Sequence, residues 1–154
     1  MIEDASDFVL PSFEEDRSGG ARIVLAMIGS EVFATATPAQ ADNFFVAVGR
    51  RIAALVPVGD IEGLDQLESR INRLWRALHW GRARLRAVDD GIAILHEGVP
   101  PGLENDFDGR WPAMVEAVLR GAYDGWFRAL GSDAALRTSL VRRLDTGLEL
   151  RHGL

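Results

Sequence analysis

Apolar side chains recur every three or four residues in the first half of the chain, which is the spacing of one face of a helix. The first such segment predicts a helix over about residues 22–34. Thr37-Pro38 opens a second helix, because a hydroxyl at the N-cap and a proline at the first helical position satisfy or remove amides that lack acceptors, and Gln40 completes a capping box. The predicted buried face of this helix comprises Ala41, Phe44, Phe45, Val48, Ile52 and Leu55.

A third helix is predicted over residues 61–81, with Asp60 as its cap and with acids early and arginines late, as the helix dipole favours. Leucine and isoleucine repeat along it at alternating steps of three and four, which makes a seam of two heptads. Two heptads are too few for a free coiled coil, so the seam is predicted to face the core or another subunit. Leu67 and Leu74 are its candidates for subunit packing.

Beyond the third helix, alanine and leucine alternate with arginine over residues 82–87, so the period changes from about 3.6 to 2. Asp89-Asp90-Gly91 supplies a turn, and residues 92–97 return as a second strand, which predicts a β-hairpin. A second hairpin is predicted near the C-terminus, turning at Asp145-Thr146-Gly147.

Between the two hairpins, the apolar spacing predicts a fourth helix over about residues 110–130. Gly121 and Gly125 lie inside it, where each costs up to ~1 kcal/mol relative to alanine. A closely approaching backbone would explain both glycines, which join the candidates for subunit packing. The fold class is therefore α+β, with N-terminal helices, a β-hairpin, a long helix and a C-terminal β-hairpin in one domain over residues 22–154.

The composition is that of an ordinary globular protein, with 47% hydrophobic and 26% charged residues in a chain of 154. The net charge of −6 is concentrated in residues 1–21, which carry six acids against Arg17 alone and are predicted to form a flexible acidic arm. The rest of the chain is close to neutral, which argues against binding to nucleic acid. No apolar run approaches the roughly 20 residues needed to cross a bilayer, and no basic signal start is present, so we expect a cytoplasmic protein.

The chemistry open to this sequence is narrow. There is no cysteine, which excludes disulfides and thiolate catalysis, and His79, His96 and His152 are too few and too scattered for a metal site. Asp89 and Asp90 are accounted for by the turn that they form. No nucleophile elbow, phosphate loop or dinucleotide fingerprint is present. We therefore expect no catalytic residue, no metal and no cofactor.

Arg82, Arg84 and Arg86 are predicted to share one face of the first strand. Such a stripe either stays solvated or binds an anion or an acidic arm, and the sequence leaves these alternatives open. A solvated strand face is the commoner case.

Four segments resemble the D subunit of bacterial cellulose synthase in their order and in their residues. They are VGRRIAALVPV, the helix ending LWRALHWG, the hairpin RARLRAVDDGIAILHEGVP and the helix RWPAMVEAVLRGAYDGWFRALG, and the resemblance covers about residues 22–131. Its most specific elements are Trp80-Gly81 before the hairpin, His96-Glu97 followed by Pro100, and Trp111 with Val118-Leu119, Gly121, Tyr123 and Trp126. None of these is a catalytic motif, so the resemblance rests on layout together with these elements.

The resemblance implies a small α+β protein without enzymatic activity that assembles into a ring-shaped homo-octamer. It also implies a role in cellulose biosynthesis, in which the protein assists glucan export and the arrangement of chains into crystalline cellulose. The implied partners are β-1,4-glucan, the other cellulose synthase subunits and, in some systems, a proline-rich accessory protein. The family has been placed both in the periplasm and in the cytoplasm, and the missing signal start favours a cytoplasmic site near the inner membrane.

Residues just ahead of the first helix line glucan passages in this family. The resemblance therefore makes Arg17, Ser18, Gly19 and Gly20 the glucan-facing candidates. The sequence departs most from the family at this point, because its arm is longer and acidic. The C-terminal hairpin is also shorter than in the family.

Two other functions fit parts of the sequence. A small-molecule-binding domain of the vinyl-reductase or trafficking-particle type shares the order of helices, hairpin, helix and hairpin. Its sequence cue would be cysteines or other ligand-fixing groups near the last helix, and the chain has no cysteine. A hydrolase acting on cellulose needs paired carboxylates, and the acids available here lie in turns and caps.

Overall fold

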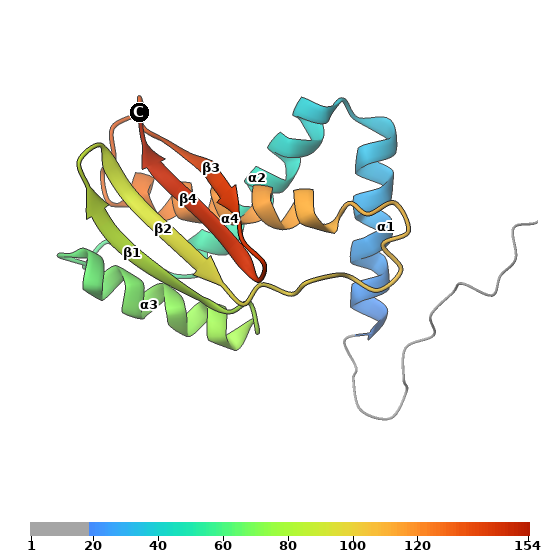
Figure 1. Ribbon diagram of the computed structural model, residues 1–154, viewed down its shortest axis with the longest axis horizontal. Coiled ribbons are helices and arrows are strands. Elements are labelled where there is room, and N and C mark those ends of the chain that lie inside the picture. Colours follow the sequence, from blue (N-terminus) through green and yellow to red (C-terminus); the bar gives the residue numbers. More distant parts are fainter. Residues whose placement is uncertain (1–18) are drawn as a thin grey trace, which may run out of the picture.

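The computed structural model describes residues 19–154 as four helices and a four-stranded antiparallel sheet (Figure 1). The elements are α1 (Gly19–Thr35), α2 (Pro38–Ala54), α3 (Leu64–Ala77), β1 (Arg82–Val88), β2 (Gly91–Glu97), α4 (Trp111–Ala129), β3 (Arg137–Arg143) and β4 (Gly147–Gly153). This order confirms the α+β class and both predicted hairpins. The capping box at the start of α2 is also confirmed, since Thr37 and Gln40 bond reciprocally through side chains and backbone.

The two hairpins form one sheet in the order β1-β2-β4-β3, because β2 pairs with β4 across the middle. Successive side chains of each strand point to opposite sides of the sheet, so the sheet has an inner face and an outer face. On the inner face, Leu85 lies beside Ile94, and Ile94 lies beside Leu150. All three are buried, and they form the floor of the core.

The crossing of α2 over α4 brings the backbones of two helices close together in the core. A Cβ added to Gly121 would lie 2.0 Å from the carbonyl oxygen of Val46, and one added to Gly49 would lie 2.0 Å from that of Val118. Each helix therefore contributes a glycine against the backbone of the other. The close approach predicted from Gly121 and Gly125 is confirmed, and α2 of the same chain makes it, since a Cβ on Gly125 would lie 3.0 Å from that of Ala53.

Aromatic rings join α3 and α4 to the inner face of the sheet. Trp75 of α3 lies edge-on to Trp126 with ring centroids 5.5 Å apart, and edge-on to His96 of β2 at 5.0 Å. Trp126 also donates from Nε1 to the carbonyl oxygen of Ala53 at 3.0 Å, which satisfies the polar atom of a buried indole. These contacts tie α2, α3, α4 and β2 into one core.

The predicted buried face of α2 is partly wrong. Phe44 and Leu55 are 46% and 69% exposed, whereas Gly49 and Ala53, absent from that prediction, are buried. The backbone of α4 comes too close for large side chains, so the buried face of α2 is built around small residues.

Two helix starts also differ from prediction. α1 begins at Gly19, three residues ahead of the expected start, so Gly19 and Gly20 are helical. α3 begins at Leu64 with Gly63 as its N-cap, so Asp60 is not the cap. Asp60 instead accepts from Arg70 Nη2 at 3.0 Å, and this hydrogen bond lowers the pKa of the Asp60 carboxyl.

Gly121→Ala tests the helix crossing. Alanine gains up to ~1 kcal/mol of helix propensity, but its Cβ meets a backbone carbonyl that cannot move without separating the helices. We expect the free energy of unfolding, measured by urea titration, to fall by at least about 2 kcal/mol. Gly20→Ala is the control, because nothing lies within 4 Å of the added Cβ, and its stability should stay within about 1 kcal/mol of the parent. Equal stability of the two variants would contradict the crossing as described.

Candidate functional site

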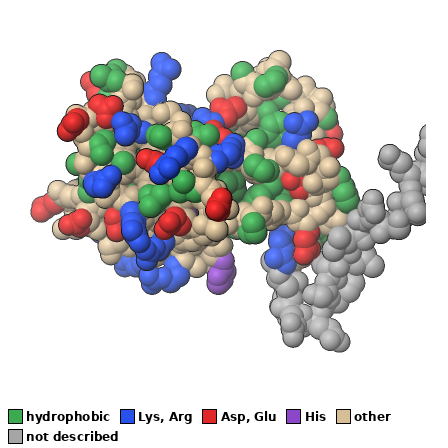
Figure 2. Space-filling model, in the orientation of Figure 1, with side chains coloured by type: hydrophobic (Ala, Val, Ile, Leu, Met, Phe, Trp, Pro, Cys, Tyr) green, Lys and Arg blue, Asp and Glu red, His purple; other side chains and the backbone are tan. Residues whose placement is uncertain are grey.

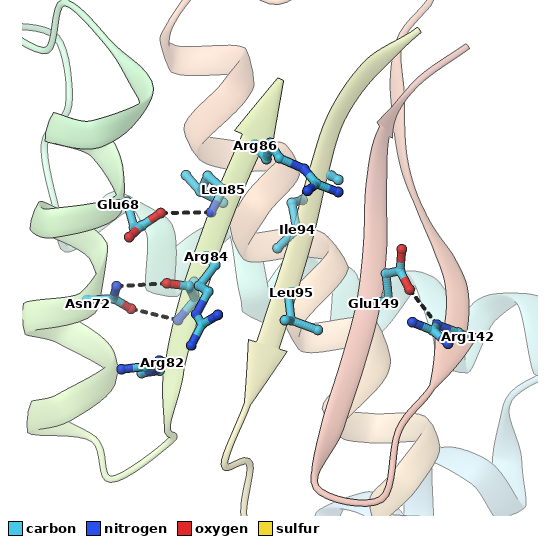
Figure 3. Close-up of a pocket in the computed structure, with 12 residues that line it drawn as sticks. Glu68, Asn72, Arg82, Arg84, Leu85, Arg86, Ile94, Leu95, Arg142 and Glu149 are labelled. Carbon is cyan, nitrogen blue, oxygen red and sulfur yellow. Dashed lines mark hydrogen bonds and ion pairs between the residues drawn. The ribbon is translucent and has the colours of Figure 1, made fainter. Parts of the chain in front are cut away.

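The outer face of the sheet carries a groove of about 530 Å³, in which the side chains of four strands meet residues from α3 (Figure 3). The register places Arg84 beside Leu95, Leu95 beside Glu149, and Glu149 beside Arg142. α4 lies behind the sheet in this view, and Arg82, Arg84 and Arg86 on the near face are exposed. The groove is therefore a charged surface with an apolar floor, open to a partner or to solvent.

Three arginines of β1 border this groove. Arg82, Arg84 and Arg86 are exposed because they alternate with Ala83 and Leu85, which are 1% and 8% exposed on the inner face. The predicted stripe is thus confirmed as a geometric feature, and we call these three residues the arginine ladder. Three other arginines of the sheet are paired: Arg142 contacts Glu149, Arg143 contacts Glu116, and Arg151 contacts Asp90 at 2.9 Å. Within residues 19–154, no ion pair involves the ladder.

Two polar side chains of α3 close the free edge of β1. Asn72 donates to the carbonyl oxygen of Ala83 at 2.9 Å and accepts from its amide at 2.7 Å, and Glu68 accepts from the amide of Leu85 at 2.8 Å (Figure 3). These bonds take the place of a further strand, so this stretch of the edge is unavailable to strand addition. Sequence reasoning missed both residues, because their partners become neighbours only when α3 folds back along β1.

His96 is held inside the core. Its Nε2 lies 2.6 Å from the carbonyl oxygen of Trp80, which can only accept, so Nε2 carries the proton and Nδ1 accepts from the Tyr123 hydroxyl at 2.6 Å. Burial lowers the pKa of His96 to about 4. The imidazole is therefore neutral at pH 7, with both nitrogens engaged in joining β2, α4 and the segment before β1.

His152 is buried at the end of β4, beside a second cavity of about 490 Å³ with mainly apolar walls. Its ring nitrogens lie 2.5 Å from Ser132 Oγ and 2.9 Å from Thr138 Oγ1, and Asp124 is 3.9 Å away. Burial lowers the pKa of this imidazole as well. The ring thereby connects β4 to β3 and to the end of α4.

The three histidines are spread over the fold. His79 lies just after α3 with a positive φ of 56° and is exposed, whereas His96 and His152 are enclosed at different places in the sheet. In the part of the chain that the structure describes, no group of three histidine, aspartate or glutamate residues is placed to hold a metal ion.

α1 presents an apolar surface of its own. It contacts only α2 and α4 among the described elements, and Val24, Met27 and Ile28 are 58%, 44% and 43% exposed. Phe44 of α2 is also exposed, and Figure 2 shows hydrophobic side chains over this part of the molecule. We call the three large hydrophobic residues of α1 that are exposed, Val24, Met27 and Ile28, the α1 face. Of the helices between residues 19 and 154, none is both long and apolar enough to cross a membrane.

The predicted glucan-facing residues fall at the beginning of α1. Arg17 and Ser18 lie outside the described residues. Gly19 is buried in the first turn of α1, while Gly20 is exposed, with open space where a Cβ would be. The structure thus describes two of the four candidates, and of these two only Gly20 is exposed to solvent.

The predicted subunit-packing residues make contacts within their own chain. Leu67 is 1% exposed in the core, Gly121 is buried against α2, and Leu74 and Gly125 are partly buried. The packing of Leu67 and Gly121 is accounted for without another subunit. A role for these four residues between subunits stays a prediction, whereas the α1 face offers exposed apolar side chains.

The comparison with known families agrees with the resemblance read from the sequence. The family model for the D subunit of cellulose synthase matches residues 18–153, which is nearly the whole chain. The match extends beyond residues 22–131 at both ends and includes the C-terminal hairpin. Residues 1–17, with their six acids, lie outside it. No curated protein matches the sequence.

His96 gives the fold a dependence on pH. Its pKa in the folded protein, about 4, lies below the ordinary histidine value of 6.5, so the unfolded chain takes up the proton first as the pH falls. Stability is therefore lost from pH 6.5 towards pH 4, by about 3 kcal/mol from this group. His152 acts in the same direction.

Urea titrations across this pH range test the assignment to His96. His96→Gln should be less stable at pH 7 but lose most of this dependence. Tyr123→Phe should keep it, because burial rather than the tyrosine hydroxyl is the main cause of the lowered pKa. The assignment fails if the parent and His96→Gln lose stability in parallel below pH 6.5.

Proposed function

Because the chain belongs to the family of cellulose synthase D subunits, we propose that it is a non-catalytic accessory subunit of the bacterial cellulose synthase complex. In this role it assists the export of glucan and the arrangement of the chains into crystalline cellulose. The match over residues 18–153 is the observation that carries this proposal. It favours this function over a small-molecule-binding domain of similar element order.

A non-catalytic role is supported by how the fold uses its polar side chains. His96 hydrogen bonds to Tyr123 and to the backbone of Trp80, and His152 contacts two hydroxyls that join strands. Asp90 lies in the hairpin turn and pairs with Arg151. Each of these groups has a structural partner, and the proposed function assigns none of them a chemical step.

Assembly into a ring-shaped homo-octamer is the second part of the proposal. An apolar surface that a single chain leaves exposed is characteristic of a site of protein contact. The α1 face has this character, and among the described helices and strands α1 contacts only α2 and α4. A ring closes when one such surface meets a different surface on the next copy at a fixed rotation. The α1 face supplies one of the two surfaces.

The proposed partners are the other cellulose synthase subunits, β-1,4-glucan and a proline-rich accessory protein. The proposed location is the cytoplasm near the inner membrane, with the periplasm as the alternative. The family match supports association with synthase subunits. Subcellular fractionation of a cellulose-producing host distinguishes the two compartments, since a cytoplasmic protein stays with the spheroplasts when the periplasm is released.

Met27→Glu combined with Ile28→Glu tests the assembly. Charges in an apolar contact are costly to desolvate, so the variant should change from eight copies to monomers or dimers in native mass spectrometry at micromolar concentration. Val141→Glu is the control, since Val141 is 49% exposed on the edge strand β3, and this variant should remain octameric. A parent protein that is monomeric or dimeric would count against the ring.

Removal of residues 1–18 tests contact with glucan. The shortened chain should bind cello-oligosaccharides at least tenfold more weakly in isothermal titration calorimetry, because it lacks Arg17 and Ser18. Gly20→Gln is the complementary variant, since it adds a side chain at the exposed candidate while leaving those two in place. Unchanged affinity in both variants would remove Arg17, Ser18, Gly19 and Gly20 as glucan contacts.

A further inference from the structure

We propose that the groove bordered by the arginine ladder binds an acidic segment of the same chain, formed by Glu3, Asp4 and Asp7. This contact is independent of glucan binding and of the ring. It concerns a charged surface that residues 19–154 leave without a counterion and a run of acids that the family match does not include.

The ladder is arranged to receive carboxylates from an extended segment. Arg82, Arg84 and Arg86 follow one another along one side of a strand, with about 7 Å between successive positions. In an extended segment, Glu3 and Asp7 point to the same side with the four-residue separation of Arg82 and Arg86, whereas Asp4 points to the other side. Guanidinium groups also bind carboxylates in a planar, bidentate manner.

The floor of the groove adds a second feature. Ala93 and Leu95 of β2 lie beside Arg86 and Arg84, and both side chains are partly exposed. In the sequence, the acids at positions 3, 4 and 7 are followed directly by Phe8-Val9-Leu10. A segment of this composition matches arginines beside an apolar floor more closely than a purely acidic segment would.

The acidic side chains on the groove do not form ion pairs with the arginine ladder among the described contacts. Glu68 and Glu149 line the groove, but Glu68 accepts from the amide of Leu85 and Glu149 pairs with Arg142. Glu97 lies directly across from Arg82 in the register and forms no ion pair with it among the described contacts. The local charge on the ladder side is therefore positive, in a protein whose net charge is −6.

The length of chain ahead of α1 selects which acids reach the groove. In Figure 1, β1 runs from the lower middle of the molecule to the side away from α1, and a domain of this size is on the order of 40 Å across. An extended chain covers about 3.4 Å per residue, so Asp7 reaches roughly 40 Å from Gly19, and Glu3 reaches further. Glu14, Glu15 and Asp16 reach less than about 20 Å. The two acidic clusters thus provide a matched pair for an experiment.

Energy transfer within the full-length chain measures this contact. The sequence has no cysteine, so Ile2→Cys gives a single site for an acceptor dye, and the four tryptophans of the folded domain act as donors. Trp80 lies two residues before the ladder. Docking should bring the dye near these donors, and 0.5 M NaCl should reduce the transfer because it shortens the screening length to a few ångströms.

Two matched pairs of variants decide the outcome. Arg82→Gln, Arg84→Gln and Arg86→Gln together should lower the transfer at least twofold, whereas Arg51→Gln, Arg73→Gln and Arg137→Gln should leave it unchanged. These control arginines are exposed on α2, α3 and the opposite edge strand. Glu3→Gln, Asp4→Asn and Asp7→Asn should likewise lower the transfer, and Glu14→Gln, Glu15→Gln and Asp16→Asn should not.

Three results would overturn the proposal. Equal effects of the ladder and control arginines would mean that only net charge matters. Equal effects of the two acidic clusters would contradict the reach argument. The third result comes from a mixing experiment. Dye-labelled chain that carries the ladder substitutions is mixed with unlabelled intact chain. Recovery of transfer in that mixture would show that the acids bind a second copy, and the contact within one chain would be wrong.

Discussion

The crossing of α2 and α4 is the constraint on which the rest of the fold depends. Gly49 and Gly121 each allow the other helix's carbonyl to come within a distance that no side chain permits. This approach fixes the position of α4, and α4 carries Tyr123 and Trp126 into the core on the inner face of the sheet. The same crossing determines which side of α2 is buried, and it leaves Phe44 exposed.

The inner face of the sheet packs against the helices and holds the core together. Trp75, His96 and Tyr123 join a helix, a strand and a second helix through rings and two short hydrogen bonds, while His152 connects the ends of β3 and β4. Because the core contacts lie on the inner face, the side chains of residues 19–154 leave the outer face and the α1 face exposed.

The sequence predicted the layout of the fold well but its contacts less well. Both hairpins, the capping box at Thr37 and the close approach at Gly121 were correct, because turns, caps and glycines act over a few neighbouring residues. Phe44 was placed in the core because helical spacing identifies an apolar stripe without giving the size of what faces it. Glu68 and Asn72 went unnoticed, since nothing local distinguishes a polar side chain that will close a strand edge.

The sequence by itself determined the α+β class, the order of the elements, the exposure of the arginine ladder and the family. These follow from periodicity and from short motifs, whose physical causes are local. Only the tertiary structure decided that the two hairpins join through β2 and β4, that His96 is a neutral core residue, and that Gly121 meets α2 of its own chain. Those outcomes depend on residues far apart in the chain, and it is packing that brings them together and sets their burial.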